Sequence, residues 1–122
     1  MTQLKIMVVE DEEFARETIT DDLNLKGFDN VLTVARGKEA IEKMEAEKPD
    51  FIFLDIQLAD EVSGMEVLKQ SKVLSPGSRC VMMSAYKDEY GQEALALGAC
   101  YFLKKPIRDL DKVVKLIEEF RI

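Results

Sequence analysis

Short apolar runs alternate with longer amphipathic segments along the whole chain. The apolar runs are Leu4 to Val9, Val31 to Ala35, Phe51 to Leu54, Cys80 to Met83 and Cys100 to Leu103. Their length and composition predict five β-strands. The first and third runs are almost continuously apolar, which is typical of strands buried on both faces of a parallel sheet rather than of half-exposed antiparallel strands.

The segments between these runs carry apolar residues at helical spacing. The last segment has one apolar stripe at i, i+3, i+4 and i+7, made of Leu110, Val113, Val114 and Ile117. Such a stripe predicts a helix with one buried side. The first segment repeats every fourth position at Ala15, Ile19 and Leu23, with Gly27 where a C-terminal cap is expected. A shorter stripe at Ala40, Ile41 and Met44 predicts a second helix.

Strands that alternate with helices predict an α/β fold built on a parallel sheet. Parallel neighbours need crossover connections, and the right-handed crossovers place helices on both faces. The chain has 122 residues without an internal repeat, a low-complexity tract or a linker. We therefore expect one domain over residues 1–122, a length at which folding buries about two thirds of the unfolded chain's surface.

Polar residues follow four of the predicted strands. Glu10 and Asp11 follow the first, Asp55 the third, Ser84 the fourth and Lys105 the fifth. Ligands of open α/β sheets bind outside these carboxyl ends, so we expect the three carboxylates to share one cleft. Each like-charge pair at about 4 Å costs roughly 4 kcal/mol at an effective dielectric near 20. The cluster therefore favours a bound cation.

The ligand chemistry favours a hard ion, since the chain has no histidine. Mg²⁺ typically binds through one or two carboxylates and keeps water positions that a phosphate oxygen can take, and Mn²⁺ prefers similar ligands. Ser84 and Lys105 would then hold other oxygens of a phosphoryl group, whose transfer depends mainly on positioning and charge neutralisation. In that geometry Asp55 is the expected nucleophile and forms an aspartyl phosphate.

Four motifs in a fixed order stand at these strand ends. They are Ile6-Met7-Val8-Val9-Glu10-Asp11-Glu12, Phe51-Ile52-Phe53-Leu54-Asp55, Met82-Met83-Ser84-Ala85 and Gly98-Ala99 through Lys105-Pro106. Together they resemble the receiver domains of response regulators in two-component phosphorelay systems, and in particular the single-domain, chemotaxis-regulator type. The resemblance covers the entire chain. It implies a flavodoxin-like, doubly wound five-stranded parallel sheet of strand order 2-1-3-4-5 with helices on both faces.

The resemblance also implies how the phosphoacceptor and its metal are held. Asp55 is similar to the residue that accepts the phosphoryl group from a phosphohistidine donor in a Mg²⁺-dependent reaction. Asp11 resembles a direct metal ligand, and Glu10 a ligand that acts through water. The backbone carbonyl of Gln57 would complete the protein's share of the metal shell.

A second group of residues resembles the family's switch. Ser84 is similar to the hydroxyl residue that moves toward the phosphoryl group, beside the backbone N–H of Ala85. Phe102 resembles the aromatic residue whose rotamer follows that movement, and Lys105 would pair with phosphoryl oxygens. The Lys105-Pro106 step resembles one that is usually cis in this family, although X-Pro bonds are cis in only about 5–6% of folded cases.

The chain departs from the family pattern directly after Asp55. Ala59 stands where proline is common, and the path from Asp55 to Gly64 is one residue longer than usual. The loop from Ala59 to Ser63 also carries additional carboxylates. We therefore expect this loop to be more mobile than in other members and its charge to disfavour approach of a phosphodonor.

The expected function is a signalling switch rather than a turnover enzyme. Its expected partners are a sensor histidine kinase or a histidine phosphotransfer protein, and a downstream protein or output domain. Dimerisation through the face of the fourth helix, fifth strand and fifth helix is a further expectation from the resemblance. Leu116 and Phe120 widen the apolar side of the last helix, which suits a partner surface or ordinary packing against the sheet.

Composition excludes several other classes of protein. The 17 Lys and Arg against 24 Asp and Glu give a net charge of -7, which repels nucleic acid. No apolar run approaches the ~20 residues of a membrane span, and residues 1–5 do not begin a signal peptide, so a cytoplasmic protein without a membrane partner is expected. Cys80 and Cys100 lie beside apolar residues and are expected to be reduced, inert thiols.

Each site residue also has a simpler structural interpretation. Asp11 could cap a helix whose first turn is rich in acids. Ser84 alone suits a turn and Lys105 alone a solvated strand end. Asp55 is harder to explain in this way, because a carboxylate that ends a buried strand is seldom buried without a partner.

Three alternative functions fit the sequence less well than the switch. A phosphatase with an aspartate nucleophile generally carries it on the first strand with a second Asp two residues on, whereas position 57 is Gln here. A degenerate receiver that binds partners without phosphorylation is disfavoured, because every expected type of site residue is present. A nucleotide-binding fold is weaker still, since both G-x-G-x-x-G and a P-loop motif are missing.

Overall fold

The computed structural model describes residues 4–58, 61–85, 91–105, 107 and 110–120, the first and last helical positions of the final segment (110 and 120) by backbone alone. Strands and helices alternate along these ranges. Their bounds are β1 (Ile6–Val9), α1 (Glu13–Leu25), β2 (Val31–Val34), α2 (Gly37–Glu47), β3 (Phe51–Asp55), α3 (Gly64–Leu74), β4 (Arg79–Ser84), α4 (Gly91–Ala96), β5 (Tyr101–Lys104) and α5 (Leu110–Phe120).

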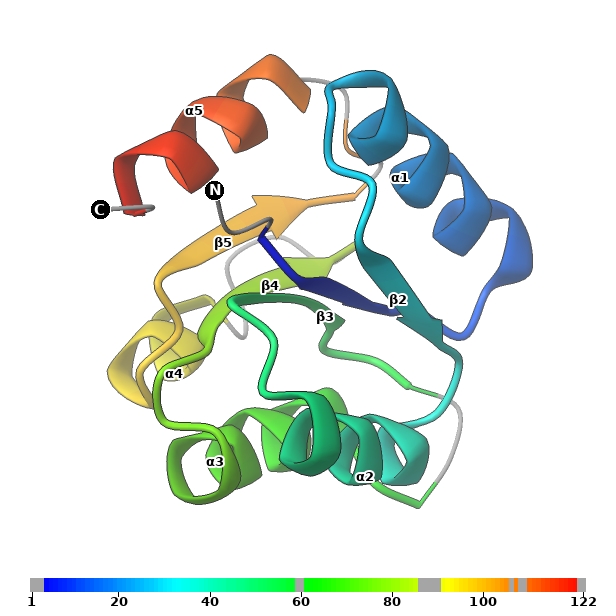
Figure 1. The fold of residues 1–122 in the computed structure, drawn as a ribbon. Helices are drawn as coiled ribbons and strands as arrows, with labels where there is room; N and C mark the ends of the chain where they lie inside the picture. The colour runs from blue at the N-terminus through cyan, green and yellow to red at the C-terminus, as the bar shows by residue number, and fades with distance from the viewer. Residues whose placement is uncertain (1–3, 59–60, 86–90, 106, 108–109, 121–122) are drawn as a thin grey trace.

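The strands form one sheet in the order β2-β1-β3-β4-β5. Every neighbouring pair is parallel, and β3 lies at the centre of the sheet between β1 and β4 (Figure 1). Helices α1 and α5 cover one face, and α2, α3 and α4 cover the other (Figure 1). This arrangement confirms the predicted doubly wound α/β fold and its strand order.

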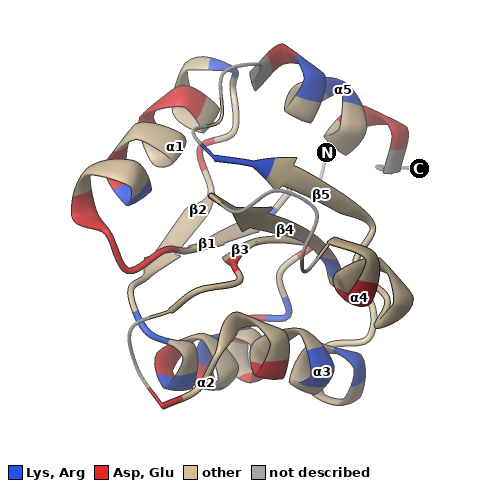
Figure 2. Cartoon of the chain, turned by 180° about the vertical axis from the view of Figure 1, so that it is seen from behind, with Lys and Arg blue, Asp and Glu red and all other residues tan. Residues whose placement is uncertain are grey.

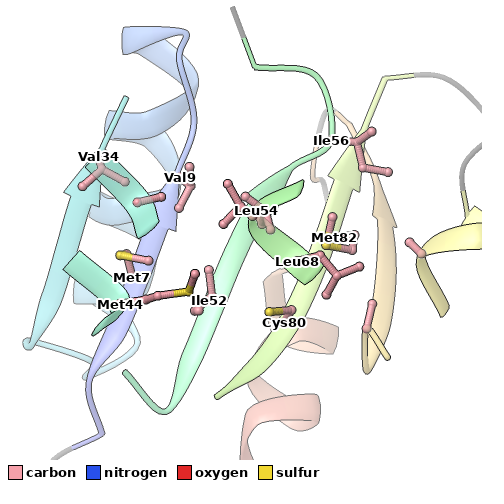
Figure 3. Close-up of a cluster of buried hydrophobic side chains, with 14 residues drawn as sticks. Met7, Val9, Val34, Met44, Ile52, Leu54, Ile56, Leu68, Cys80 and Met82 are labelled. Carbon is pink, nitrogen blue, oxygen red and sulfur yellow. The ribbon is translucent and has the colours of Figure 1, made fainter. Parts of the chain in front are cut away.

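The nearly continuous apolar runs are explained by a core on each face of the sheet. Odd and even positions of a strand point to opposite faces. In β3, Phe51 and Phe53 therefore join the core under α1 and α5, while Ile52 and Leu54 join the core over α2 and α3. Figure 3 shows the second core, where side chains from four strands meet Met44 and Leu68 of the helices.

The helical stripes predicted from spacing face these cores. Ile19 and Leu23 of α1 are buried, as are Val113 and Ile117 of α5. Leu116 is also buried, so the packing interpretation is correct for this residue. The side chain of residue 120 lies outside the described part of the chain. No helix in the described ranges is long and apolar enough to cross a membrane.

Several boundaries differ from the sequence-based prediction. The first strand begins at Ile6 rather than Leu4, and β5 begins at Tyr101 rather than Cys100. β3 and β4 extend to Asp55 and Ser84, so these residues end their strands instead of following them. The reason is the ladder itself, because Asp55 is still paired with Met83 in the parallel register.

The first helix begins one residue later than a cap at Asp11 would require. Glu12 is the N-cap, and its carboxylate accepts a hydrogen bond from Ala15 N at 2.9 Å. The capping interpretation of Asp11 is therefore wrong, and its carboxylate is not used to begin the helix. At the other end of α1, Gly27 has φ +97, a conformation that favours glycine after a helix.

The two cysteines are free thiols, Cys80 buried and Cys100 half-buried. Burial raises the pKa of both thiols. Since the thiolate is the reactive form of cysteine, these shifts support the expectation that both are inert.

Candidate functional site

The parallel register brings Glu10 and Asp55 together at one edge of the sheet. Val9 of β1 pairs with Leu54 of β3, so the residues that follow them lie side by side. Glu10 and Asp55 share the side-chain parity of Ile6, Val8, Phe51 and Phe53, and so point toward the face that α1 and α5 cover. Figure 2 shows acidic positions at the ends of β1 and β3 and basic positions at the end of β5.

Lys105 lies between these two carboxylates. Its Nζ donates a hydrogen bond to Asp55 Oδ2 at 3.0 Å and lies 2.5 Å from Glu10 Oε1 in an ion pair. Glu10 Oε1 is buried, and the ion pair with Lys105 is its contact among the described residues. Lys104 is exposed, as the alternation of a strand requires.

The acidic residues form a compact cluster. One carboxylate oxygen from each of Glu10, Asp11 and Asp55 lies within 4.8 Å of the other two. Glu10 and Asp55 are buried, while Asp11 is half-buried. One lysine against three carboxylates leaves negative charge in a partly desolvated site, and such a site favours a cation.

These residues fit a hard divalent ion. All three offer oxygen ligands, which Mg²⁺ prefers, and the half-buried Asp11 marks an open side where water and a phosphate oxygen could complete the coordination shell. The buried Glu10 Oε1 is paired with Lys105, and a carboxylate oxygen has a second lone pair that a metal-bound water could use. The acidic cluster that the sequence predicts is therefore present.

Burial raises the pKa of Glu10 to about 7, although its contact with Lys105 lowers it. For Lys105, burial lowers the pKa, but its contacts with Glu10 and Asp55 outweigh burial and raise it overall. Lys105 therefore keeps its charge, and Glu10 is the group whose ionisation is disfavoured in the metal-free site.

This shift predicts the pH dependence of a Glu10→Gln variant without metal. Between pH 4.5 and about 7 the folded protein holds a proton on Glu10 that the unfolded chain releases, so the stability that Glu10 contributes below pH 4.5 is lost as pH rises through about 7. Glutamine has no charge to bury. In EDTA we expect the variant to gain about 1–3 kcal/mol on wild type between about pH 5 and pH 8.

Urea unfolding of wild type and Glu10→Gln at about pH 5 and about pH 8 measures this gain. The exposed Glu42 of α2 offers the control Glu42→Gln, for which the difference from wild type should not change with pH. An equally pH-independent difference for Glu10→Gln would show that burial of its charge does not limit metal-free stability.

The expected switch residues share the opposite face of the sheet. Ser84 is fully buried, and Lys105 N donates to the Ser84 carbonyl at 2.8 Å. Phe102 pairs with Met82 in the register, so Ser84 and Phe102 both have the parity of the core over α2, α3 and α4. The ring of Phe102 lies against Gly91 at the start of α4, 3.6 Å from the position where a Cβ would stand.

Hydrogen bonds donated by backbone N–H groups hold the loop after Asp55. Gln57 N donates to Asp55 Oδ1 at 3.0 Å, and Gly64 N donates to the Ile56 carbonyl at 3.0 Å. Ser63 caps α3 by accepting from Glu66 N at 3.2 Å. Both oxygens of Asp55 thus accept a hydrogen bond, one from Gln57 and one from Lys105, which fixes the plane of the carboxylate.

Some predictions lie beyond the described residues or stay untested. Ala59 and Pro106 are outside the described ranges. The predictions on the mobility of the loop at residues 59–60 and on the isomer of the Lys105-Pro106 bond are therefore not tested. Ala85 is exposed at the end of β4. The roles of the Gln57 carbonyl and the Ala85 N–H remain predictions.

The chain is similar to known proteins over nearly its full length. A family model for the response regulator receiver domain matches residues 6–118. The chain is 38% identical over 120 residues to the alkaline phosphatase synthesis transcriptional regulatory protein PhoP of Bacillus subtilis, which covers 93% of this chain and 48% of that protein. It is 32% identical over 117 residues to the chemotaxis protein CheY of Listeria monocytogenes, covering 95% of this chain and 97% of that protein.

A solved structure extends the similarity to the fold. The response regulator receiver domain (CheY-like) from Methylobacillus flagellatus superposes with a TM-score of 0.85 at 27% sequence identity, covering 98% of this chain and 99% of that chain. The chain belongs to the response regulator receiver family and is a receiver domain of two-component signal transduction. It spans about half the length of PhoP and almost all of CheY.

Two residues near the site were not singled out from sequence. Arg16 of α1 donates from Nη1 to the Glu10 carbonyl at 2.9 Å. Gly64 begins α3 so close to β3 that a Cβ there would stand 2.1 Å from the Asp55 carbonyl oxygen. The sequence offered two signals, the glycine after the site loop (Gly64) and the basic residue beside the acidic turn (Arg16). Both contacts depend on how separate elements pack, which the sequence pattern does not specify.

Proposed function

We propose that this receiver domain is a phosphorylation switch in which Asp55 accepts a phosphoryl group. The observation that carries the proposal is the position of Asp55, whose carboxylate contacts Lys105 and lies in one cluster with the carboxylates of Glu10 and Asp11. A bound Mg²⁺, or Mn²⁺ in its place, would neutralise the oxygens of the phosphoryl group. Asp11 and Asp55 would hold the ion directly, with Glu10 acting through water and Gln57 through its carbonyl.

The chemistry of the step follows from these positions. A carboxylate oxygen of Asp55 attacks phosphorus, a new oxygen–phosphorus bond forms, and the bond from phosphorus to the donor nitrogen breaks. Lys105 already contacts Asp55 at 3.0 Å, so its ammonium can balance charge on the phosphoryl oxygens during transfer. Ser84 would move toward the phosphoryl group and bind another oxygen. The later movement of Ser84 and Phe102, which share one face of the sheet, would then carry the change to the surface near α4.

The product is a state of the protein rather than a released metabolite. The chain would supply phosphoryl transfer and self-dephosphorylation without acting as a turnover enzyme. Its output would pass to a downstream protein or output domain. Dimerisation through α4, β5 and α5, a cytoplasmic location, the absence of nucleic-acid binding and a domain over residues 1–122 remain predictions.

The test is a phosphorylation assay with a small donor. Wild-type protein is incubated with acetyl phosphate and Mg²⁺, and intact mass is measured with and without EDTA. One phosphoryl adduct that requires Mg²⁺ and is removed by hydroxylamine, as an acyl phosphate should be, is the expected result. No adduct would favour the degenerate receiver, and rapid turnover of unrelated phosphate esters would favour the phosphatase.

A surface pocket beside Lys105 supports a docking site for the phosphodonor protein. The pocket has a volume of about 360 Å³ and is lined by Phe14, Ala15 and Ile19 of α1 together with Ala85, Lys105 and Ile107. Phe14 is 75% exposed, so an aromatic side chain stands in solvent at a pocket that Lys105, the ion-pair partner of Asp55, also lines. We propose that a histidine kinase or phosphotransfer protein packs on this surface while its phosphohistidine reaches Asp55.

Phe14→Ala should separate donor docking from the transfer chemistry. With a donor protein that labels the wild type, we expect transfer to slow roughly tenfold, since truncating a central apolar contact costs about 1–2 kcal/mol. Labelling by acetyl phosphate should not change. Leu25 is 83% exposed on the same helix but does not line the pocket, so Leu25→Ala is the matched control. Equal slowing with both donors would place the effect of Phe14 in the site instead.

A further inference from the structure

Arg16 connects the first helix to the acidic turn at the end of β1. Its Nη1 donates to the backbone carbonyl of Glu10 at 2.9 Å, in a partly buried position. Arg16 is itself held in the helix, because its N–H donates to the Glu12 carbonyl at 3.0 Å and its carbonyl accepts from Thr20 Oγ1 at 2.8 Å. The contact therefore joins two ordered segments.

The turn that Arg16 contacts carries two of the three clustered carboxylates. Glu10 N donates to the Val34 carbonyl at 3.1 Å, and Glu10 Oε2 accepts from Glu12 N at 3.2 Å. The bond from Arg16 adds a side-chain donor to this stretch of backbone. Asp11 follows Glu10 directly, so the direction of its half-buried carboxylate depends on the peptide that Arg16 holds.

We infer that Arg16 is a positioning residue for the metal site. Its guanidinium holds the Glu10–Asp11 peptide in the orientation that turns both carboxylates toward Asp55. The inference rests on the proposed function, since it assumes that the cluster binds Mg²⁺. Groups that orient metal ligands without touching the ion typically change metal affinity about 10- to 100-fold when they are removed.

A positioning role and a simple charge effect predict opposite results. A cation near three carboxylates opposes the binding of a second cation, so the loss of its charge alone would strengthen Mg²⁺ binding. Loss of an anchor would weaken it. Arg16→Met removes the charge and the donor together and keeps a long side chain of similar helix propensity. Arg16→Lys keeps the charge but loses the planar group with several donors.

The experiment measures Mg²⁺ affinity by titration calorimetry on the full chain, so that phosphorylation is not needed. We expect Arg16→Met to bind about tenfold more weakly than wild type and Arg16→Lys to lie between them. Tighter or unchanged binding by Arg16→Met would overturn the inference. If Arg16→Met does not fold, Arg16→Lys decides, because weaker binding supports positioning and wild-type affinity overturns it.

A matched control separates positioning from a general loosening of α1. Ile19 is buried on the same helix and its side chain has no hydrogen-bond donor, so Ile19→Val lowers stability without removing the anchor. It should retain wild-type affinity, and weakening equal to that of Arg16→Met would overturn the role of Arg16. Wild-type protein that binds no Mg²⁺ would overturn the proposed function and the inference together, whereas normal wild-type binding with an unchanged Arg16→Met would overturn the inference alone.

Discussion

An Asp55→Asn variant is expected to lose the phosphoryl adduct completely while it keeps the fold. Asparagine has almost the same shape, and its side-chain oxygen can still accept a hydrogen bond from Gln57 N or from Lys105 Nζ, the two donors that hold Asp55 now. It lacks the anionic oxygen that attacks phosphorus, so labelling by acetyl phosphate should fall at least about 100-fold, to the detection limit.

The same substitution should not lower the stability of the metal-free protein, although it abolishes labelling. It removes one of the three carboxyl groups whose oxygens lie within 4.8 Å of one another, so repulsion in the metal-free protein decreases. Thermal unfolding in EDTA should therefore occur at or above the wild-type temperature, and added Mg²⁺ should stabilise the variant less than wild type. This result would separate loss of the nucleophile from loss of structure.

Asp21→Asn is the matched control for this experiment. Asp21 is an exposed acid on α1 outside the cluster, and its substitution should leave both the adduct and the Mg²⁺ response intact. An Asp55→Asn protein that is still labelled at the wild-type rate would show that another residue accepts the phosphoryl group.

The site could be predicted from sequence because a parallel sheet converts sequence position into spatial position. Each strand ends at the same edge, so an acid after the first strand and an acid at the end of the third must meet when β1 and β3 are neighbours. Strand parity then decides which residues face one another. Glu10, Asp55 and Lys105 have the same parity and meet, while Lys104 is exposed.

Features that depend on the approach of separate elements were not predictable in this way. The bond from Arg16 to Glu10 joins residues only six positions apart, but it requires the guanidinium to fold back along α1, which helical spacing does not specify. The N-cap of α1 is Glu12 rather than Asp11. Three consecutive acids can each begin a helix, and only the packing of β1 selects one of them.

The strand ends show a related limit. The apolar pattern stops at Leu54 and Met83, where the chain becomes polar, yet the ladder continues through Asp55 and Ser84. A buried polar group at such a position is tolerated when it has partners. Asp55 accepts from Lys105 and Gln57. The chemistry of the site therefore begins inside the sheet, and periodicity alone places its edge one residue too early.

Gly64→Ala is expected to be the most destabilising small substitution near the site. A Cβ at this position would lie 2.1 Å from the Asp55 carbonyl oxygen and 2.6 Å from Ile56 Cα. Both are backbone atoms, one in the last residue of β3 and one in the residue after it, so no side chain can rotate to make space. Overpacking of this kind forces the backbone to move, and we expect a loss of roughly 4 kcal/mol in unfolding free energy.

The displacement should also change the position of the phosphoacceptor, because the atoms that must move belong to Asp55 and to the residue after it. Where Gly64→Ala folds, we expect slower labelling by acetyl phosphate and a melting temperature lower by roughly 10 °C or more. Gly77→Ala is the control, since a Cβ there meets nothing within 4 Å and its φ is not positive. That substitution should be neutral or stabilise by about 0.4–1 kcal/mol through the unfolded chain. Equal effects of the two variants would mean that the contact between α3 and the end of β3 does not position Asp55.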